Sequence, residues 1–376
     1  MEKIKKGVRL EHISKIYKDP KTGKDFYAVK DTDLEIKPGS FVTLLGPSGC
    51  GKTTTLRMIA GLETPTEGEI TINDRIVFSS EKGIDIAASK RDVGFLFQNY
   101  ALWPHMTVTK NISFGLENLK WPKDKIQARV DELLKMLRIE EFKDRYPAEL
   151  SGGQQQRGAI ARTLATGPKV LFMDEPLSNL DAKLRMEMRT ELKRLHHDTD
   201  STFVYVTHDQ LEAMTLSTKI CLMKNGVLQQ YANPLEVYRN PANTFTADFV
   251  GSPNINLLNF TLKDMTLKNS DGLTLKIAMC DNSKVNDQDV ILGLRPEYVQ
   301  ISNEGSVKGE IYSSLPSGME TIVKVKIGSI QLNSVIFGDG DFTVGDNHPI
   351  AFPGIYNLFD KDGNRIGRCK IISASL

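Results

Sequence analysis

The feature that most constrains this chain is a glycine-rich run, GPSGCGKT (46–53), that ends in a lysine and a threonine. It follows a strand-like run, FVTLLG (41–46), and leads into a helix-like run, TTTLRMIAGL (53–62). Glycines let successive backbone N–H groups converge on phosphate oxygens, and the following helix adds its positive N-terminal end. Because strand, loop and helix occur in the order that this pattern requires, the sequence predicts a phosphate-binding loop in an α/β fold.

The residue types in this loop suit the binding of a nucleoside triphosphate together with Mg²⁺. Lys52 can neutralise charge on the β- and γ-phosphates, and the Thr53 hydroxyl can ligate Mg²⁺. We interpret Cys50 as a small residue whose backbone matters, rather than as a redox sensor. The residues of this loop that we expect to contact the nucleotide are Gly46, Pro47, Ser48, Gly49, Cys50, Gly51, Lys52, Thr53 and Thr54.

A second phosphate-site element is the run VLFMDE (170–175), in which apolar residues end in two carboxylates. Asp174 fits a water-mediated Mg²⁺ ligand at a strand end, and Glu175 is placed to orient or deprotonate an attacking water. Strands often end in acids, but a position about 120 residues after a phosphate loop strengthens the nucleotide interpretation. Adjacent residues of an extended segment point to opposite sides, so the two carboxylates need not share one role.

The pattern of elements changes near residue 240. Before it, apolar strand-like runs alternate with helical patterns, which predicts a mostly parallel sheet. After it, the helical periodicity disappears and short β-rich runs are divided by Gly, Asn and Asp, which predicts a small all-β barrel or sandwich. The predicted domains are therefore 1–240 and 241–376, with a hinge signal at Asn240-Pro241.

A helical insert is expected inside the first domain, over about 99–161. The segment 123–139 places Ile126, Val130, Leu134 and Leu137 on one face at helical spacing. This arrangement is typical of an ordinary helix packed against a core.

Composition excludes several classes of protein. Lys plus Arg number 48 and Asp plus Glu 47, and a net charge of +1 argues against a broad basic surface for nucleic acid. The four cysteines form no CxxC pair and are expected to be reduced thiols. No apolar run approaches the ~18 residues of a membrane helix, and the basic N-terminus lacks the apolar stretch of a signal peptide.

The run LSGGQ (150–154), followed by QQR, resembles the signature of ABC transporters, and with it the chain resembles the ATP-binding subunit of an ABC transporter. A Ser-Gly-Gly sequence can open a helix and expose N–H donors to a phosphate. The resemblance implies that this site binds the γ-phosphate of ATP held by the loop of a second copy, so the active unit would be a homodimer. The residues that it assigns across the dimer are Ser151, Gly152, Gly153, Gln154 and, in the segment SNLD (178–181), Asp181.

Three further positions match this family one at a time. Gln98, in FLFQ (95–98), resembles the glutamine that senses Mg²⁺ and the attacking water. His208, in YVTHD (205–209), resembles the switch histidine at the γ-phosphate, and Tyr17 resembles the aromatic residue that stacks on adenine. The resemblance therefore implies an ATPase with Glu175, His208 and Gln98 as catalytic residues. Taken alone, a histidine at a strand end is more often a capping or core residue, and a lone tyrosine more often packs.

Other segments narrow the resemblance to importers of the maltose type. QNYALWPHMTV (98–108) resembles the surface that receives a helix from a membrane subunit, although Tyr100, Leu102 and Trp103 could instead form a local core cluster. FVGSPNIN (249–256) and GLRPE (293–297) resemble the regulatory domain of that subfamily, which has an OB-like β-barrel fold. The expected fold is thus a P-loop ABC ATPase domain with a helical insert, followed by a smaller all-β, OB-like regulatory domain.

The resemblance also implies partners and a place in the cell. We expect two membrane-spanning permease subunits, an extracytoplasmic solute-binding protein that acts indirectly, a possible regulator at the C-terminal domain, no nucleic acid, and a peripheral position on the cytoplasmic face of the cell membrane. A sugar is the expected solute, and polyamine, iron or another small ion is the alternative. A single phosphate loop and the short stretch between Thr53 and Leu150 disfavour ABC ATPases that do not serve transport.

Two positions depart from the family pattern. Gly158 follows the signature where a branched apolar residue is commoner, and a glycine inside a helix costs about 1 kcal/mol relative to alanine. LPSG (315–318) stands where a turn with Gly and an acid is usual. The first departure predicts a looser helix, and the second weakens any assignment of ligand residues in the C-terminal domain.

Overall fold

The computed structural model describes residues 7–18, 23–281, 285–338 and 340–376. The chain divides into two compact units, Met1–Pro234 and Leu235–Leu376. The division lies N-terminal to the hinge signal at Asn240-Pro241. In the described part of the chain, every helix is too short or too polar to cross a membrane.

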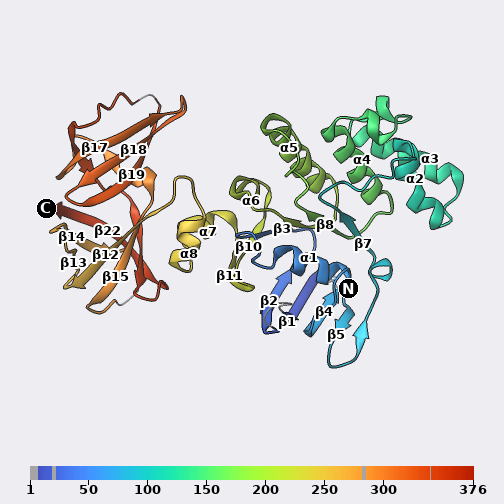
Figure 1. Ribbon diagram of the computed structural model, residues 1–376, viewed down its shortest axis with the longest axis horizontal. Helices are drawn as coiled ribbons and strands as arrows, with labels where there is room; N and C mark the ends of the chain where they lie inside the picture. The colour runs from blue at the N-terminus through green and yellow to red at the C-terminus, as the bar shows by residue number, and fades with distance from the viewer. Residues whose placement is uncertain (1–6, 19–22, 282–284, 339) are drawn as a thin grey trace. The chain divides into compact units, whose positions relative to one another are not determined.

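A six-stranded sheet forms the centre of the first unit, in the order β11-β10-β3-β9-β8-β7 (Figure 1). Its pairs are parallel, except that β11 runs antiparallel to β10. Every residue of β3, β8 and β9 is buried, as expected for strands covered on both faces. The predicted parallel sheet is confirmed. Its strands are β3 (Phe41–Leu45), β7 (Val93–Leu96), β8 (Val170–Asp174), β9 (Thr202–Val206), β10 (Lys219–Lys224) and β11 (Val227–Ala232).

Alternate residues of these strands face two different hydrophobic cores. Val204 and Val206 of β9 pack in the core that also holds helix α1 (Lys52–Ala60). Phe203 and Tyr205 of the same strand pack in the core that holds α4 (Gly152–Ala165) and α5 (Ala182–Asp198). The helix α6 (Gln210–Leu216) adds Leu216 to this second core. The two cores cover both faces of the sheet, the phosphate loop follows β3, and the acidic pair comes at the end of β8.

An antiparallel sheet, β2-β1-β4-β5-β6, completes the first unit and was not predicted. Its strands are β1 (Val8–Lys18), β2 (Asp25–Ile36), β4 (Glu67–Ile72), β5 (Arg75–Ser79) and β6 (Ile84–Asp85), and η1 (Ala88–Lys90) follows. Leu10 and Ile70 of this sheet are buried in the same core as α1. The pairing of β1 with β2 shifts register between Leu10 and Ile13, which interrupts the alternation by which a strand is recognised.

The predicted helical insert consists of α2 (Val108–Asn118), α3 (Lys123–Met136), the short turns η2 (Glu140–Phe142) and η3 (Pro147–Glu149), and then α4 (Figure 1). Val130, Leu134 and Leu137 are buried, and Ile126 is half-buried against them. The one-sided packing predicted from their spacing is present.

The second unit is mostly β-structure, as predicted. Six strands close into a barrel in the order β12-β13-β14-β22-β21-β15. Five further strands form a second sheet, β16-β20-β17-β18-β19. The barrel strands are β12 (Asn256–Lys263), β13 (Thr266–Lys268), β14 (Thr274–Met279), β15 (Gln288–Leu294), β21 (Ile355–Asp360) and β22 (Arg365–Ser375). The second sheet has β16 (Gln300–Ile301), β17 (Val307–Pro316), β18 (Glu320–Ile327), β19 (Ile330–Phe337) and β20 (Asn347–Ala351), with η4 (Pro296–Tyr298) before it.

Helical structure does not end at residue 240, so that expectation was wrong. Helix α7 (Pro234–Arg239) is followed by α8 (Thr244–Phe249), which Asn243 caps by accepting a hydrogen bond from the Thr246 N–H. Six residues are too few to show helical periodicity, and only the Asn cap marks this helix in the sequence.

Candidate functional site

The phosphate loop connects β3 to α1, and three of its glycines adopt positive φ angles. These are 150° at Gly46, 76° at Gly49 and 103° at Gly51. A Cβ atom on Gly46 would lie 2.3 Å from the Met223 carbonyl oxygen, and one on Gly51 would lie 2.3 Å from the Ala28 carbonyl oxygen. Because both neighbours are backbone atoms, only glycine fits at these two positions.

Lys52 begins α1, and its side chain folds back over the loop. Its Nζ donates to the carbonyl oxygens of Gly46, at 2.8 Å, and Pro47, at 2.9 Å. Lys52 is buried, so the ammonium stays inside the curve of the loop, where phosphate oxygens can take the place of the carbonyls. Burial raises the pKa of the Cys50 thiol, which keeps this thiol protonated at neutral pH.

Asp174 ends strand β8 beside the first turn of α1. Its Oδ1 accepts a hydrogen bond of 3.0 Å from the Thr53 hydroxyl, and its Oδ2 lies 3.5 Å from Nη2 of Arg57. Burial raises the pKa of the Asp174 carboxyl, and the contacts with Thr53 and Arg57 partly oppose that shift. Hydroxyl and carboxylate oxygens are ligands that Mg²⁺ prefers, so this pair fits a magnesium site next to the phosphate loop.

Arg57 was not predicted as a site residue. It lies one turn after Thr53 on α1, so both side chains reach Asp174 from one helix face. That spacing was visible in the sequence and could have identified it.

Glu175 and His208 lie together at the ends of neighbouring strands. Nδ1 of His208 is 3.3 Å from Oε2 of Glu175. The Glu175 N–H donates to the Val206 carbonyl oxygen at 3.1 Å, and Glu175 has a φ angle of 45°. A positive φ is costly for a residue with a side chain and is found most often where function constrains the backbone. The arrangement can hold a proton acceptor and an imidazole over one reacting atom.

Gln98 joins this group through the segment that follows Glu175. The Gln98 side chain donates from Nε2 to Ser178 Oγ at 3.2 Å. The Gln98 backbone carbonyl oxygen accepts from Asn179 Nδ2 at 3.1 Å. Ser178 Oγ in turn donates to the Glu175 carbonyl oxygen at 2.8 Å. Residues that are far apart in the sequence are thus linked by side-chain bonds at one edge of the parallel sheet.

The signature run opens helix α4 with a capping box. The Ser151 hydroxyl accepts from the Gln154 N–H at 3.4 Å, and Gln154 Oε1 accepts from the Ser151 N–H at 2.8 Å. Ser151 and Gly152 are exposed, so the helix N-terminus faces outward, as binding of an anion from another molecule requires. Among the described residues, no hydrogen bond or ion pair joins this run to the phosphate loop of the same chain.

Asp181 caps α5, with Oδ1 accepting from the Leu184 N–H at 3.0 Å. Leu184 also lies against the signature helix, since a Cβ atom on Gly153 would come within 2.8 Å of its Cδ1. A Cβ atom on Gly152 would lie 3.4 Å from Cδ2 of Leu180, so the segment that ends in Asp181 and the signature run pack side by side.

Tyr17 stands apart from these groups on strand β1. It is exposed and stacks on Phe26 of β2, with 6.1 Å between the ring centroids. Nζ of Lys15 lies 4.9 Å from the centre of the Tyr17 ring. The pair presents an aromatic surface on which a flat ring could stack.

The aromatic run after Gln98 is divided between core and surface. Tyr100 is buried, which supports the local-core interpretation for this residue. Trp103 is half-buried, with its ring 4.5 Å from that of Phe114 and 4.8 Å from the Arg162 guanidinium carbon. Leu102 is also half-buried against the core. Trp103 is therefore packed against the insert and only partly exposed.

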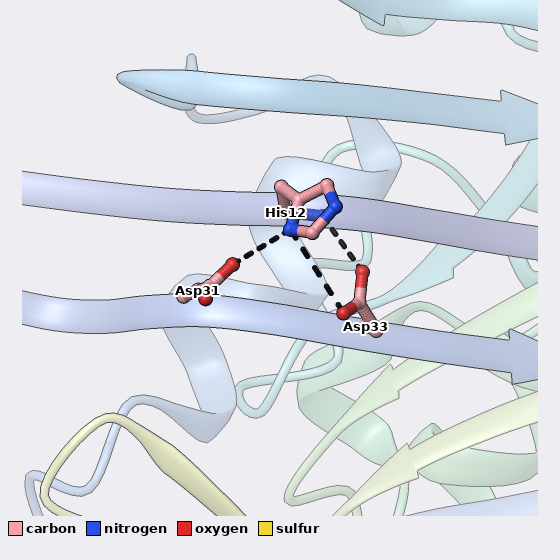
Figure 2. Close-up of side chains that lie close together, drawn as sticks. All are labelled: His12, Asp31 and Asp33. Atoms are coloured by element: carbon pink, nitrogen blue, oxygen red, sulfur yellow. Dashed lines mark hydrogen bonds and ion pairs between the residues drawn. The ribbon is translucent and has the colours of Figure 1, made fainter.

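One further group of metal-ligating side chains occurs among the described residues, and it lies on the antiparallel sheet. Figure 2 shows His12 of β1 beside Asp31 and Asp33 of β2. His12 Nδ1 is 2.9 Å from Asp31 Oδ1 and 4.0 Å from Asp33 Oδ2. The hydrogen bond with Asp31 and the charge of both carboxylates raise the pKa of His12. All three residues are exposed, so the group behaves as a solvated ion-pair cluster.

Comparison with known proteins identifies a family for the first unit. Residues 29–178 match the family model described as ABC transporter. This range includes the phosphate loop, the signature run and the acidic pair at the end of β8.

The chain is also similar to characterised relatives along most of its length. The trehalose/maltose import ATP-binding protein MalK of Thermococcus litoralis is 45% identical over 338 residues, which cover 86% of this chain and 89% of the relative. The sn-glycerol-3-phosphate import ATP-binding protein UgpC of Bordetella avium is 42% identical over 89% of this chain and 92% of its own length.

A solved structure matches the first unit. It is the dimeric structure of a post-hydrolysis state of the ATP-binding cassette MJ0796 bound to ADP and Pi, with a TM-score of 0.52 and 35% identity. The match covers 60% of this chain and 98% of the cassette.

Proposed function

This chain belongs to the ABC transporter family, among its import ATP-binding proteins, and on that premise we propose that it works as a homodimer that energises sugar uptake through two membrane-spanning subunits. It is an ABC ATPase, as its family and its cassette-like first unit show. The observation that carries the proposal is the grouping of Lys52, Asp174, Glu175 and His208 at one edge of the parallel sheet, with the signature run facing outward.

In this proposal the phosphate loop binds the triphosphate of ATP. The loop N–H groups and the Lys52 ammonium neutralise the phosphate oxygens, and Tyr17 stacks on the adenine. Thr53 and Asp174 hold Mg²⁺, with Gln98 nearby, and the ion supplies positive charge to the phosphates. The hydroxyl and carboxylate pair between Thr53 and Asp174 supports this assignment.

Glu175 and His208 act on the reacting atoms. The Glu175 carboxylate accepts a proton from the attacking water, and the His208 imidazole donates to the γ-phosphate and orients it. Gln98 fixes the position of the water and the segment after Glu175 through Ser178. The separation of 3.3 Å between His208 Nδ1 and Glu175 Oε2 supports the action of both residues at one reacting centre.

A second copy of the chain completes the site. Ser151 and Gly153 of the signature run donate hydrogen bonds, from hydroxyl and backbone N–H groups, to the γ-phosphate held by the other copy. Asp181 lies at the same interface. The outward-facing N-terminus of α4 supports this arrangement, as does the dimeric form of the matching cassette. Hydrolysis removes the interaction that favours the closed dimer, so the two copies separate again.

The solute and the further partners follow from the importer family. The trehalose/maltose relative supports a sugar, and the sn-glycerol-3-phosphate relative makes a phosphorylated polyol the second candidate. We place the chain on the cytoplasmic face of the membrane, where an extracytoplasmic solute-binding protein acts on it only through the permease. The exposed apolar side chains of Leu315, Met319 and Phe337 in the second unit offer a surface for a regulator.

A substitution of Trp103 tests whether this residue couples ATP hydrolysis to the membrane subunits. Trp103→Ala should leave ATP binding intact and lower solute-stimulated hydrolysis in the complex with the permease. Trp121→Ala is the matched control, because the chain has only these two tryptophans and Trp121 also lies in the helical insert. Equal loss of stimulation in both variants would contradict the coupling role.

The transport function is tested in cells. Removal of this chain should abolish uptake of one radiolabelled solute, which wild type but not Glu175→Gln restores. Uptake of maltose, trehalose, glycerol 3-phosphate and spermidine, compared in parallel, distinguishes a sugar from the other candidates. Unchanged uptake of all solutes after removal of the chain would overturn the proposal.

A further inference from the structure

Glu212 is a buried carboxylate on α6, just after the segment that carries His208. It is 3% exposed. Its Oε2 accepts two hydrogen bonds, from the Tyr205 hydroxyl at 2.8 Å and from the Thr207 hydroxyl at 2.7 Å. Tyr205 and Thr207 are themselves buried. A buried carboxylate needs such partners, because an unpaired one costs several kcal/mol.

Thr207 connects this carboxylate to the peptide of His208. Its hydroxyl donates to Glu212 and also accepts from the Asp209 N–H at 3.0 Å. Its own N–H donates to the Leu44 carbonyl oxygen, in the strand that leads into the phosphate loop, at 3.3 Å. The residues on both sides of His208 are therefore held by bonds that converge on one threonine.

Helix α6 is also bonded to the segment around His208. The Asp209 carboxylate caps α6 by accepting from the N–H groups of Leu211, at 2.8 Å, and Glu212, at 3.1 Å. Asp209 Oδ2 also lies 3.7 Å from Nη1 of Arg185. The backbone at His208 is thus fixed by α6, β9 and β3, while its imidazole is exposed and directed at Glu175.

We propose that Glu212 is a positioning residue, which through Thr207 holds the His208 peptide so that the imidazole faces Glu175 and the γ-phosphate. The proposal rests on the proposed function, because it requires His208 to act in hydrolysis. The Glu212 carboxylate is bonded to Tyr205 and Thr207, and we expect it to act on His208 only through Thr207. A loss of this link would let the imidazole move, and small displacements of a catalytic group cost large factors in rate.

Thr207→Val tests the link, because valine keeps the shape and removes the hydroxyl. We expect kcat for ATP hydrolysis to fall about tenfold and KM for ATP to change less than about twofold. Thr207→Ser, which keeps the hydroxyl, should retain most of the wild-type kcat. Thr202→Val is the matched control, since Thr202 is also a buried threonine, at the start of β9, and its hydroxyl accepts from the Gly39 N–H instead.

A readout independent of turnover is the imidazole signal of His208. The chain has 6 histidines, so the ring resonances can be assigned one by one. In Thr207→Val the His208 resonances should shift and broaden, while those of the exposed His105 and His197 stay unchanged. Thr202→Val should leave the His208 resonances as in wild type, whereas those of His196, which bonds to the Gly39 carbonyl oxygen, can change.

A double-mutant comparison separates an effect of Thr207 on the position of His208 from an effect on the stability of the surrounding fold. In the His208→Ala background, where no imidazole remains to be held, Thr207→Val should cause no further loss of residual hydrolysis. An equal loss in both backgrounds, or unchanged His208 resonances in Thr207→Val, would overturn the proposal. Either result would leave the ATPase function intact, whereas wild-type turnover in His208→Ala would contradict the role of His208 as well.

Discussion

Nδ1 of His208 lies 3.3 Å from Oε2 of Glu175, although the two residues follow different strands of the parallel sheet. The contact links the carboxylate next to Asp174 to the segment fixed by Thr207. It places two groups of complementary chemistry, a proton acceptor and a donor to phosphate, beside the phosphate loop.

Asp174→Asn should raise the melting temperature of the nucleotide-free chain at neutral pH and lower Mg²⁺-dependent hydrolysis at least about tenfold. Burial raises the pKa of the Asp174 carboxyl, so the native state favours the protonated acid. Stabilisation from this group is therefore present at acid pH and is lost as the pH rises through its folded-state pKa. Neutral asparagine avoids that loss.

Calorimetry from about pH 4 upward, without nucleotide, checks this prediction, because the change begins near the ordinary pKa of 3.8. The difference in melting temperature between Asp174→Asn and wild type should grow as the pH rises through the folded-state pKa of Asp174 and stay constant above it. Asp144→Asn, at an exposed position, is the control. A lower melting temperature for Asp174→Asn at pH 7 would show that the contacts with Thr53 and Arg57 outweigh the cost of burial.

Substitution by alanine at two glycines of the signature helix should change the stability of the chain in opposite directions. Gly158→Ala should stabilise the chain by about 0.5–1 kcal/mol, because a helical glycine loses that much relative to alanine. The new Cβ would lie 3.7 Å from Leu102 Cδ1, an ordinary contact. Gly153→Ala should destabilise it, because its Cβ would lie 2.8 Å from Leu184 Cδ1. Thermal unfolding followed by the helical circular dichroism signal measures both, and equal shifts would contradict the packing described.

His12 should titrate above the ordinary value of 6.5. Its hydrogen bond with Asp31, followed by the charges of Asp33 and Asp31, raises its pKa, and Asp31→Asn should lower it again. The stabilisation is complete below the ordinary pKa and is lost as the pH rises through the raised one. A proton NMR titration of the histidine rings tests this, with exposed His105 as the internal reference. A pKa of His12 that Asp31→Asn does not change would contradict the ion-pair cluster.

The phosphate site could be predicted from sequence because its chemistry is local. The loop at Lys52 follows a mostly apolar strand, and Asp174 and Glu175 come at the end of another; such runs identify buried parallel strands. Gln98 and His208 needed the family resemblance, since a single glutamine or histidine has no local signal. The structure then brought both to the same sheet edge as Glu175.

Other features had no usable signal. The bulge at His12 breaks the alternation of β1, with φ angles of 51° at His12 and 39° at Asp31, so the antiparallel sheet was missed. Glu212 reads in sequence as an acid in the first turn of a helix, where such residues are usually exposed. Only the fold shows that its carboxylate is buried against Tyr205 and Thr207.

The central claim is that two copies of the chain share each ATP and that Glu175 is required for its hydrolysis. The most direct measurement is ATP hydrolysis by the purified chain as a function of protein concentration, beside Glu175→Gln. We predict activity that rises faster than linearly with protein, and a variant that binds ATP and dimerises without turnover. Activity per chain that is independent of concentration in a demonstrated monomer, or full activity in Glu175→Gln, would contradict the account.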